Sequence, residues 1–205
     1  MSAFVLGLDG GGTKVVAEVA TPDGVELGRG IGGACNIAVM SVEDALASAM
    51  GAATAALAEA GVEARQIQAV CAGVAGASFT ERCLAFHGGL EQGFSLAKVE
   101  VLPDYAIAHT AALGGAPGVI VIAGTGSIAY GETDTGLSHR TGGYGYLIDD
   151  AGSGYGVAGP GLPPRFAPSM VPAGLPRCSI CFSLAFPCVR RRISCLWFTA
   201  ARWIA

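Results

Sequence analysis

The sequence contains few of the side chains on which many catalytic and metal sites are built. Of its 205 residues only three are histidines and 14% are charged, although 52% are hydrophobic, enough for a sizeable core. His87, His109 and His139 occur singly, without the spacing of a zinc site or a partner serine, so we expect surface or packing roles. Four cysteines near the C-terminus also make a weak zinc motif, since no histidine accompanies them: Cys178, Cys181, Cys188 and Cys195.

Targeting segments and long apolar runs are absent as well. Met1-Ser2-Ala3 has no basic character, and the first apolar run ends at a charged loop, so no signal peptide is indicated. The apolar stretch 178–189 is too short for a bilayer span, and the arginines at 190–192 have no other basic surface to form a nucleic-acid site. Three scattered cysteines fit a reduced cytosol: Cys35, Cys71 and Cys83. We therefore expect a cytoplasmic protein with no membrane and no nucleic-acid partner.

Two glycine-rich segments, about 115 positions apart, each follow an apolar run. Asp9-Gly10-Gly11-Gly12-Thr13-Lys14 follows residues 4–8, and Gly124-Thr125-Gly126-Ser127 follows residues 119–123. Because glycine lacks Cβ, backbone N–H groups in such turns can approach oxyanions closely, and the Thr, Ser and Lys side chains add further donors. The two loops together indicate one phosphate chain held from both sides.

The residues after each loop exclude two common nucleotide-binding motifs. Val15–Ala20 is β-branched at three of its six positions and is closed by the turn at 21–24. Ile128–Tyr130 resumes strand character after the second loop. A Walker P-loop and a dinucleotide fingerprint both open a helix, and neither pattern is present. Each loop is therefore predicted to be the tip of a β-hairpin.

Between the loops the pattern predicts alternating helices and strands. Ser41-Val42-Glu43-Asp44 resembles a capping box with Asp in place of Glu, and an alanine-rich run continues to Ala60 before Gly61, which predicts a helix. A strand, a helix, a strand and a helix are then expected at 67–74, 80–90, 99–102 and 105–113. The order β-β-β-α-β-α-β-α, with a second lobe from near Gly118, predicts an α/β fold.

Six blocks of the chain resemble the N-acetylglucosamine kinase and BadF/BadG/BcrA/BcrD-type ATPase group of the actin-like ATPase superfamily. They occur in the family's order: Leu8–Lys14, Cys35-Asn36, Gly73–Ala77, Pro103-Asp104, Gly124–Ser127 and Gly142–Tyr155. The resemblance covers residues 4–159. It implies an actin-like (ribonuclease H-like) ATPase fold with a complete first lobe over residues 1–117. The second lobe would be incomplete, with residues 118–159 forming its start.

The resemblance also implies ATP and Mg²⁺ as cofactors. The ATP phosphates would be bound by both glycine loops: Gly10, Gly11, Gly12, Thr13, Lys14, Gly124, Thr125, Gly126 and Ser127. Asp9 would hold Mg²⁺ through water, because this ion prefers oxygen ligands and keeps much of its hydration shell. The alternative for Asp9 is a turn-forming residue, since Asp-Gly is a strong turn signal.

Asp104 is expected to be the catalytic base. It lies after an apolar strand and before a helix, where catalytic groups emerge in open α/β sheets, and a kinase needs a carboxylate near the acceptor hydroxyl. The alternative is a helix N-cap. Relatives usually carry Asn before this Asp, whereas this chain has Pro103.

The sugar-contacting residues implied by the resemblance are Asn36, Gly142, Gly143, Tyr144 and Asp150. Asn36 could instead be a loop residue, and Asp150 a helix cap. The family has a Gly-Asp-Glu-Gly-Ser run around this Asp, and here Ala151 replaces the glutamate, which weakens the assignment of an acetamido sugar.

The implied function is ATP-dependent phosphorylation of an amino sugar, N-acetylglucosamine or glucosamine, by a sugar kinase of carbohydrate metabolism. One alternative is an ATPase that drives a conformational change in a partner; such proteins usually carry a cysteine cluster, which the spacing of the early cysteines does not resemble. Another is a remnant that binds nucleotide or sugar without turnover. The sequence leaves a homodimer open.

Residues 160–205 differ in composition from the rest of the chain. All sixteen acidic residues lie at or before Asp150, whereas residues 161–205 contain six arginines and no Asp, Glu or Lys. Pro160, Pro163 and Pro164 cannot propagate the helix into which relatives continue. We expect an aberrant, out-of-frame and poorly ordered C-terminus on a truncated kinase, with little ATP affinity and a tendency to aggregate through exposed apolar surface. A natural short variant with its own tail is the alternative.

Overall fold

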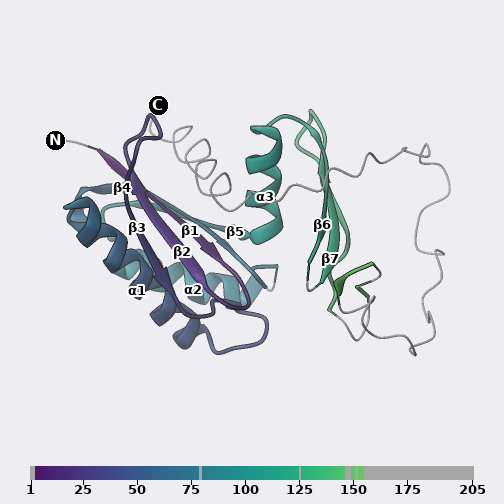
Figure 1. The fold of residues 1–205 in the computed structure, drawn as a ribbon, viewed down its shortest axis with the longest axis horizontal. Coiled ribbons are helices and arrows are strands. Elements are labelled where there is room, and N and C mark those ends of the chain that lie inside the picture. Colours follow the sequence, from purple (N-terminus) through teal and green to yellow (C-terminus); the bar gives the residue numbers. More distant parts are fainter. Residues whose placement is uncertain (1–2, 79, 125, 146–148, 151, 155–205) are drawn as a thin grey trace. The chain divides into compact units, whose positions relative to one another are not determined.

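The computed structural model describes residues 3–78, 80–124, 126–145, 149–150 and 152–154. They fall into two compact units that divide between Pro117 and Gly118, one with a five-stranded and one with a three-stranded sheet (Figure 1). The assignment of these units to two lobes of a kinase stays a prediction. The tail expected at 160–205 lies outside the described residues.

The first unit contains a mixed sheet with strand order β3-β2-β1-β4-β5, in which β1, β2 and β3 are antiparallel and β4 and β5 run parallel to β1. The predicted order β-β-β-α-β-α-β-α is confirmed, with one short 3-10 helix added. The elements are β1 (Phe4–Gly10), β2 (Val15–Ala20), β3 (Glu26–Gly32), α1 (Val42–Ala60), η1 (Ala64–Gln66), β4 (Ile67–Val74), α2 (Thr80–Gly93), β5 (Lys98–Pro103) and α3 (Asp104–Leu113).

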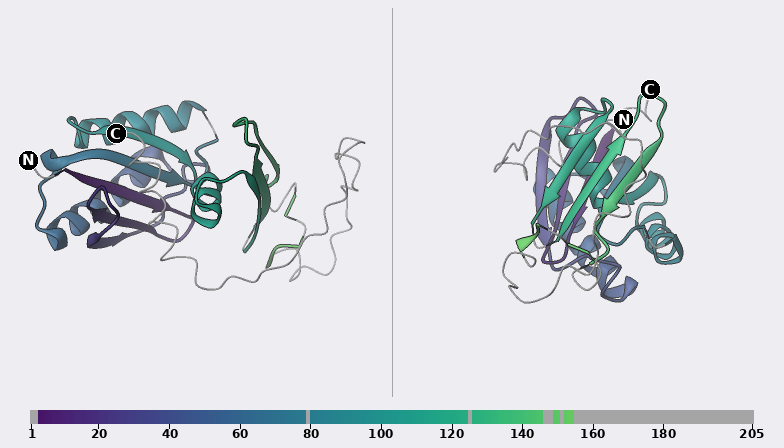
Figure 2. Two further views of the ribbon diagram at one scale, coloured as in Figure 1. Left: turned by 90° about the horizontal axis from the view of Figure 1, so that it is seen from above. Right: turned by 90° about the vertical axis from the view of Figure 1, so that its right-hand side faces the viewer.

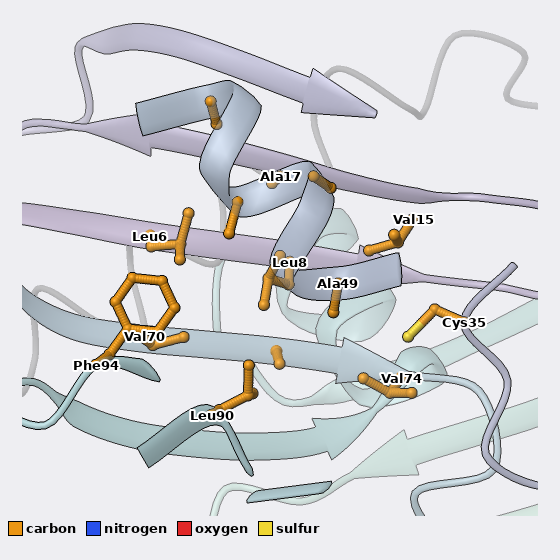
Figure 3. Close-up of a cluster of buried hydrophobic side chains, with 14 of the residues drawn as sticks. Leu6, Leu8, Val15, Ala17, Cys35, Ala49, Val70, Val74, Leu90 and Phe94 are labelled. Carbon is orange, nitrogen blue, oxygen red and sulfur yellow. The ribbon is translucent and has the colours of Figure 1, made fainter. Parts of the chain in front are cut away.

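Alternation along the strands creates a core on each face of this sheet. Leu6 and Leu8 of β1 point to the face covered by α1 and α2, where they meet Leu90 of α2 (Figure 3). On the opposite face, Val16 of β2 packs with Ile107 of α3. The central strands β1, β2 and β4 are therefore buried on both sides, as expected for strands that carry almost continuous apolar runs.

Helix α1 lies unusually close to β3 because β3 carries glycine at alternate positions. A Cβ at Gly30 would overlap the carbonyl oxygen of Ala52, and one at Gly28 would overlap backbone atoms of Ala60. The helix contributes only small side chains to this contact, and its buried residues are Ala45, Ala49, Ala52, Ala53 and Ala56. Backbone-to-backbone packing of this kind leaves no room for an added methyl group.

The ends of α1 follow the predicted signals. The Ser41 side chain accepts a hydrogen bond from the Asp44 N–H at 3.1 Å, and Gly61 ends the helix with a φ of 64°. Among the described residues, no helix combines the length and the apolar character needed to cross a membrane.

The second unit contains β6 (Gly118–Ala123), β7 (Ser127–Glu132) and β8 (Ser138–Gly142), which form an antiparallel sheet (Figure 2). The predicted hairpin is confirmed, since Ala123 pairs with Ser127 across the second glycine loop. The strand β8 was not predicted. Val119 and Val121 of β6 are 71% and 50% exposed.

Candidate functional site

The first glycine loop closes the β1–β2 hairpin as predicted. Gly10 pairs with Val15 in the ladder, and the Gly11 N–H donates to the Lys14 carbonyl at 3.0 Å. Gly12, Thr13 and Lys14 are exposed. The tip of the hairpin therefore presents glycine backbone, a hydroxyl and an ammonium group to solvent.

The base of this loop is fixed by two backbone hydrogen bonds from distant segments. The Cys35 N–H donates to the Gly11 carbonyl and the Ala75 N–H donates to the Gly10 carbonyl, both at 2.9 Å. Cys35 is fully buried, and a Cβ built on Gly10 would lie 3.0 Å from its Sγ. Gly10 is thus a packing glycine, whereas Gly12 has no heavy atom within 4 Å of such a Cβ.

The predicted site residues of the first unit gather at one edge of the sheet. Strands β1, β4 and β5 are parallel, so their carboxyl ends meet there. Gly10, Val74 and Pro103 form one row across them, which places the start of α3 about 10 Å from the first loop. Asp9, half-buried, lies in the preceding row beside Gly73.

Asp104 is the first residue of α3, directly after β5. The N-cap is Pro103, and the Asp104 Oδ1 accepts a hydrogen bond from the Tyr105 N–H at 2.9 Å. The carboxylate thus lies in the positive field of the helix N-terminus without being the N-cap itself. A Cβ at Gly73 would overlap the Ile107 side chain, so the glycine of β4 allows α3 to pack closely on the sheet.

Asn36 lies next to the end of β4. It forms an isolated parallel bridge with Ala75, and its Oδ1 accepts from the Ala38 N–H at 3.0 Å. The side-chain oxygen therefore stabilises the loop, which is the alternative role that the sequence allowed for Asn36. The side-chain amide N–H groups are able to donate to a ligand. Structure thus brings Asn36, Asp9, Asp104 and the first loop to one edge.

A second group of predicted residues gathers in the second unit. Asp150 accepts a hydrogen bond from the Ser127 N–H through Oδ1 at 2.8 Å. Gly142 pairs with Ile128 at the end of β8, and Gly143 lies against the same isoleucine. Thr125 lies outside the described residues.

Tyr144 is 52% exposed, and its ring centroid lies 4.9 Å from the Cζ of Arg140. This is a cation–π contact on the surface of the second unit. About half of the Tyr144 side chain is therefore accessible to solvent beside this contact.

The donor set fits Mg²⁺ bound to a nucleotide. The described residues contain no cluster of three or more His, Cys, Asp or Glu side chains that could hold a metal ion by themselves. Mg²⁺ is commonly held by one or two carboxylates together with phosphate and water, so a single carboxylate at Asp9 beside the exposed loop is sufficient.

The cysteines of the first unit are packing residues. Burial raises the pKa of Cys35 to about 12, and burial together with the Glu100 charge raises that of Cys71 to about 12. Such thiols are poor nucleophiles and poor metal ligands near neutral pH.

Two supports of the site were not predicted: Ala75, which fixes Gly10, and Gly154, whose N–H donates to the Gly124 carbonyl at 2.7 Å. Both lie within blocks that carry the family resemblance. Backbone contacts of this type leave no side-chain signal in the sequence.

Residues 6–162 match the model of the BadF/BadG/BcrA/BcrD ATPase family. Two curated relatives are an N-acetylmuramic acid/N-acetylglucosamine kinase of Clostridium acetobutylicum, 34% identical over 154 residues, and the glucosamine kinase GspK of Vibrio cholerae serotype O1, 33% identical over 154 residues. These matches cover 75% and 74% of this chain and 50% of each relative, so the chain spans about half the length of the curated relatives it matches.

Among solved structures, a proposed N-acetylglucosamine kinase from Chromobacterium violaceum aligns with a TM-score of 0.64 and 28% identity, over 73% of this chain and 52% of that one. The predicted fold class is confirmed, because the structural neighbours are actin-like ATPases and sugar kinases that the chain covers in part.

Proposed function

Because the chain belongs to the BadF/BadG/BcrA/BcrD ATPase family, we propose that the protein transfers the terminal phosphoryl group of ATP to a hydroxyl group of an amino sugar, glucosamine or N-acetylglucosamine. The observation that carries this proposal is the position of Asp104 at the same edge of the sheet as the first glycine loop. The kinase names of the two curated relatives support the choice of substrate class.

The first loop would bind the ATP phosphates with its backbone N–H groups, the Thr13 hydroxyl and the Lys14 ammonium group. Gly124, Thr125, Gly126 and Ser127 of the second glycine loop are also proposed to bind phosphate. Asp9 would hold Mg²⁺, which when bound neutralises charge on the phosphates.

Asp104 would accept the proton of the sugar hydroxyl as the phosphoryl group arrives. Its carboxylate is held by the N–H of Tyr105, so its direction is fixed before the substrate binds. The Asn36 amide would donate to a neighbouring sugar hydroxyl. Gly142, Gly143 and Tyr144 are also proposed to contact sugar, as the family resemblance implies. Proton transfer to a well-placed base contributes roughly a hundred- to ten-thousand-fold in rate.

A partner-driving ATPase with a metal cluster has less support. Cys35 and Cys71 are fully buried in different core clusters, so these two thiols do not meet at a common surface site. Sugar-independent ATP hydrolysis would nevertheless distinguish this function from a kinase.

The proposal is tested by ADP release from the 205-residue chain with Mg²⁺ and ATP, alone and with a panel of hexosamines. A kinase should release ADP much faster with glucosamine or N-acetylglucosamine, because the bound sugar completes the site and excludes water. Hydrolysis that is indifferent to every sugar would contradict the proposal.

Asp104→Asn should abolish sugar-dependent ADP release while leaving ATP binding largely intact. Asp23→Asn is the matched control, because Asp23 is an exposed carboxylate in the β2–β3 turn, at the opposite end of the sheet from the loop. Near-normal turnover in Asp104→Asn would show that this carboxylate only stabilises the helix.

A further inference from the structure

The Asp150 carboxylate lies directly on the second glycine loop. Its Oδ1 accepts from the Ser127 N–H at 2.8 Å. A Cβ built on Gly126 would lie 2.9 Å from Oδ1 and 3.2 Å from Oδ2, so both carboxylate oxygens face the loop. The absence of a side chain at Gly126 is what allows this approach.

The segment that carries Asp150 is bound to the loop at a second point. The Gly154 N–H donates to the Gly124 carbonyl at 2.7 Å. The segment itself is closed by the Ser153 N–H, which donates to the Asp150 carbonyl at 3.0 Å, and Ser153 is fully buried. One side-chain bond and one backbone bond therefore hold the two ends of the loop.

We propose that Asp150 is a positioning residue of the second glycine loop and acts on nucleotide binding through Ser127 and Gly126. This inference rests on the proposed kinase function and replaces a sugar-contacting role for Asp150. A hydrogen bond from a backbone N–H to a carboxylate is stronger than one between neutral groups, so it keeps the loop in one conformation before ATP binds. Because Asp150 binds the Ser127 N–H and lies against Gly126, a change in the Asp150 side chain should change the backbone that faces the phosphates.

The test compares Asp150→Ala with Asp150→Asn in the 205-residue chain. The alanine variant removes the acceptor, so the Ser127 amide should exchange with solvent deuterium about tenfold faster or more, and the Kd for ATP should rise. The asparagine variant keeps an acceptor oxygen, so both values should stay within about threefold of wild type. Asp149→Ala is the matched control, because this neighbouring carboxylate lies beside Gly142 and not on the Ser127 N–H.

Two results would overturn the positioning role. One is unchanged protection of the Ser127 amide in Asp150→Ala. The other is an equal rise in the sugar KM for both Asp150 variants with an unchanged Kd for ATP, which would identify Asp150 as a sugar ligand. Faster exchange at Ser127 in Asp150→Ala without sugar-dependent ADP release in the wild-type chain would support the positioning role and contradict the kinase proposal.

Discussion

Replacing Gly10 by alanine should destabilise the first unit, whereas the same replacement at Gly12 should not. The new Cβ at position 10 would lie 3.0 Å from the Cys35 Sγ and 3.1 Å from its Cβ and carbonyl oxygen. Carbon atoms pack at about 3.5–4.0 Å, so Cys35 or the loop must move by about 0.5 Å. Cys35 is buried and its N–H is bound to Gly11, so this movement is resisted.

Overpacking a core typically costs about 1–3 kcal/mol, and the modest overlap at Gly10 places the expected loss of unfolding free energy near 1–2 kcal/mol. The melting temperature should fall by roughly 3–8 °C. Gly12→Ala meets no atom within 4 Å and should leave the unfolding free energy within about 0.5 kcal/mol of wild type.

The assay is urea unfolding followed by circular dichroism, combined with ATP titration of each variant. Gly12→Ala should weaken ATP binding alone, because a methyl group at the exposed tip hinders close approach of a phosphate. In the Gly10→Ala background, Cys35→Ala should cost less than it does in the wild-type chain, since it removes the nearest contact, with a coupling energy of about 0.5 kcal/mol or more. Equal unfolding midpoints for the two glycine variants would refute the distinction between a packing glycine and a ligand-facing one.

Three further predictions concern the first unit. Gly30→Ala should lower the unfolding free energy measured in urea by about 3 kcal/mol or more, because the new methyl group overlaps the backbone of α1. Gly51→Ala, on the exposed side of α1, should raise it by about 0.5–1 kcal/mol. Equal effects of the two substitutions would contradict the close packing of α1 on β3. Iodoacetamide at pH 8 should label Cys83 well before the buried Cys71, whose pKa of about 12 leaves about one thiolate in ten thousand. Peptide mass spectrometry gives the order of labelling, and the opposite order would contradict the burial of Cys71. Burial raises the pKa of Glu100, so the stability linked to its titration is present below the unfolded pKa and lost as pH rises through the folded one. Glu100→Gln should therefore raise the unfolding free energy at pH 7 and have little effect near pH 3, and a pH-independent difference would exclude this cause.

The order of elements in the first unit could be predicted because its strands and helices carry local signals. Three of the six residues of β2 are β-branched and the strand follows a glycine turn, and α1 is capped by Ser41 and Gly61. These signals act within one element, so they survive without knowledge of the tertiary structure.

Two features of the fold depended on contacts between distant elements. The sequence predicts a helix over 80–90, whereas α2 extends to Gly93. A Cβ at Gly89 would overlap Leu46 of α1, and one at Gly93 would overlap Met50. They are helix-packing glycines. The strand β8 (Ser138–Gly142) contains no aliphatic residue, so no apolar run predicts it. It is defined by its backbone pairing with β7.

The candidate site likewise contains residues that local signals predict and contacts that depend on distant segments. Asp9 and Asp104 could be located because Asp9 lies near the end of an apolar strand and Asp104 follows another, and parallel strands bring such positions to one edge. The contact between Asp150 and Ser127 spans 23 positions and depends on how the chain returns to the second loop. No local pattern contains that information.

The most direct test of a sugar kinase is the fate of the terminal phosphoryl group of ATP. The 205-residue chain is incubated with Mg²⁺, γ-labelled ATP and glucosamine or N-acetylglucosamine, and the labelled products are separated and identified by mass spectrometry. A labelled hexosamine phosphate should form in equal amount to ADP and be absent in Asp104→Asn. Label that appears only as inorganic phosphate, whatever sugar is present, would contradict the kinase proposal.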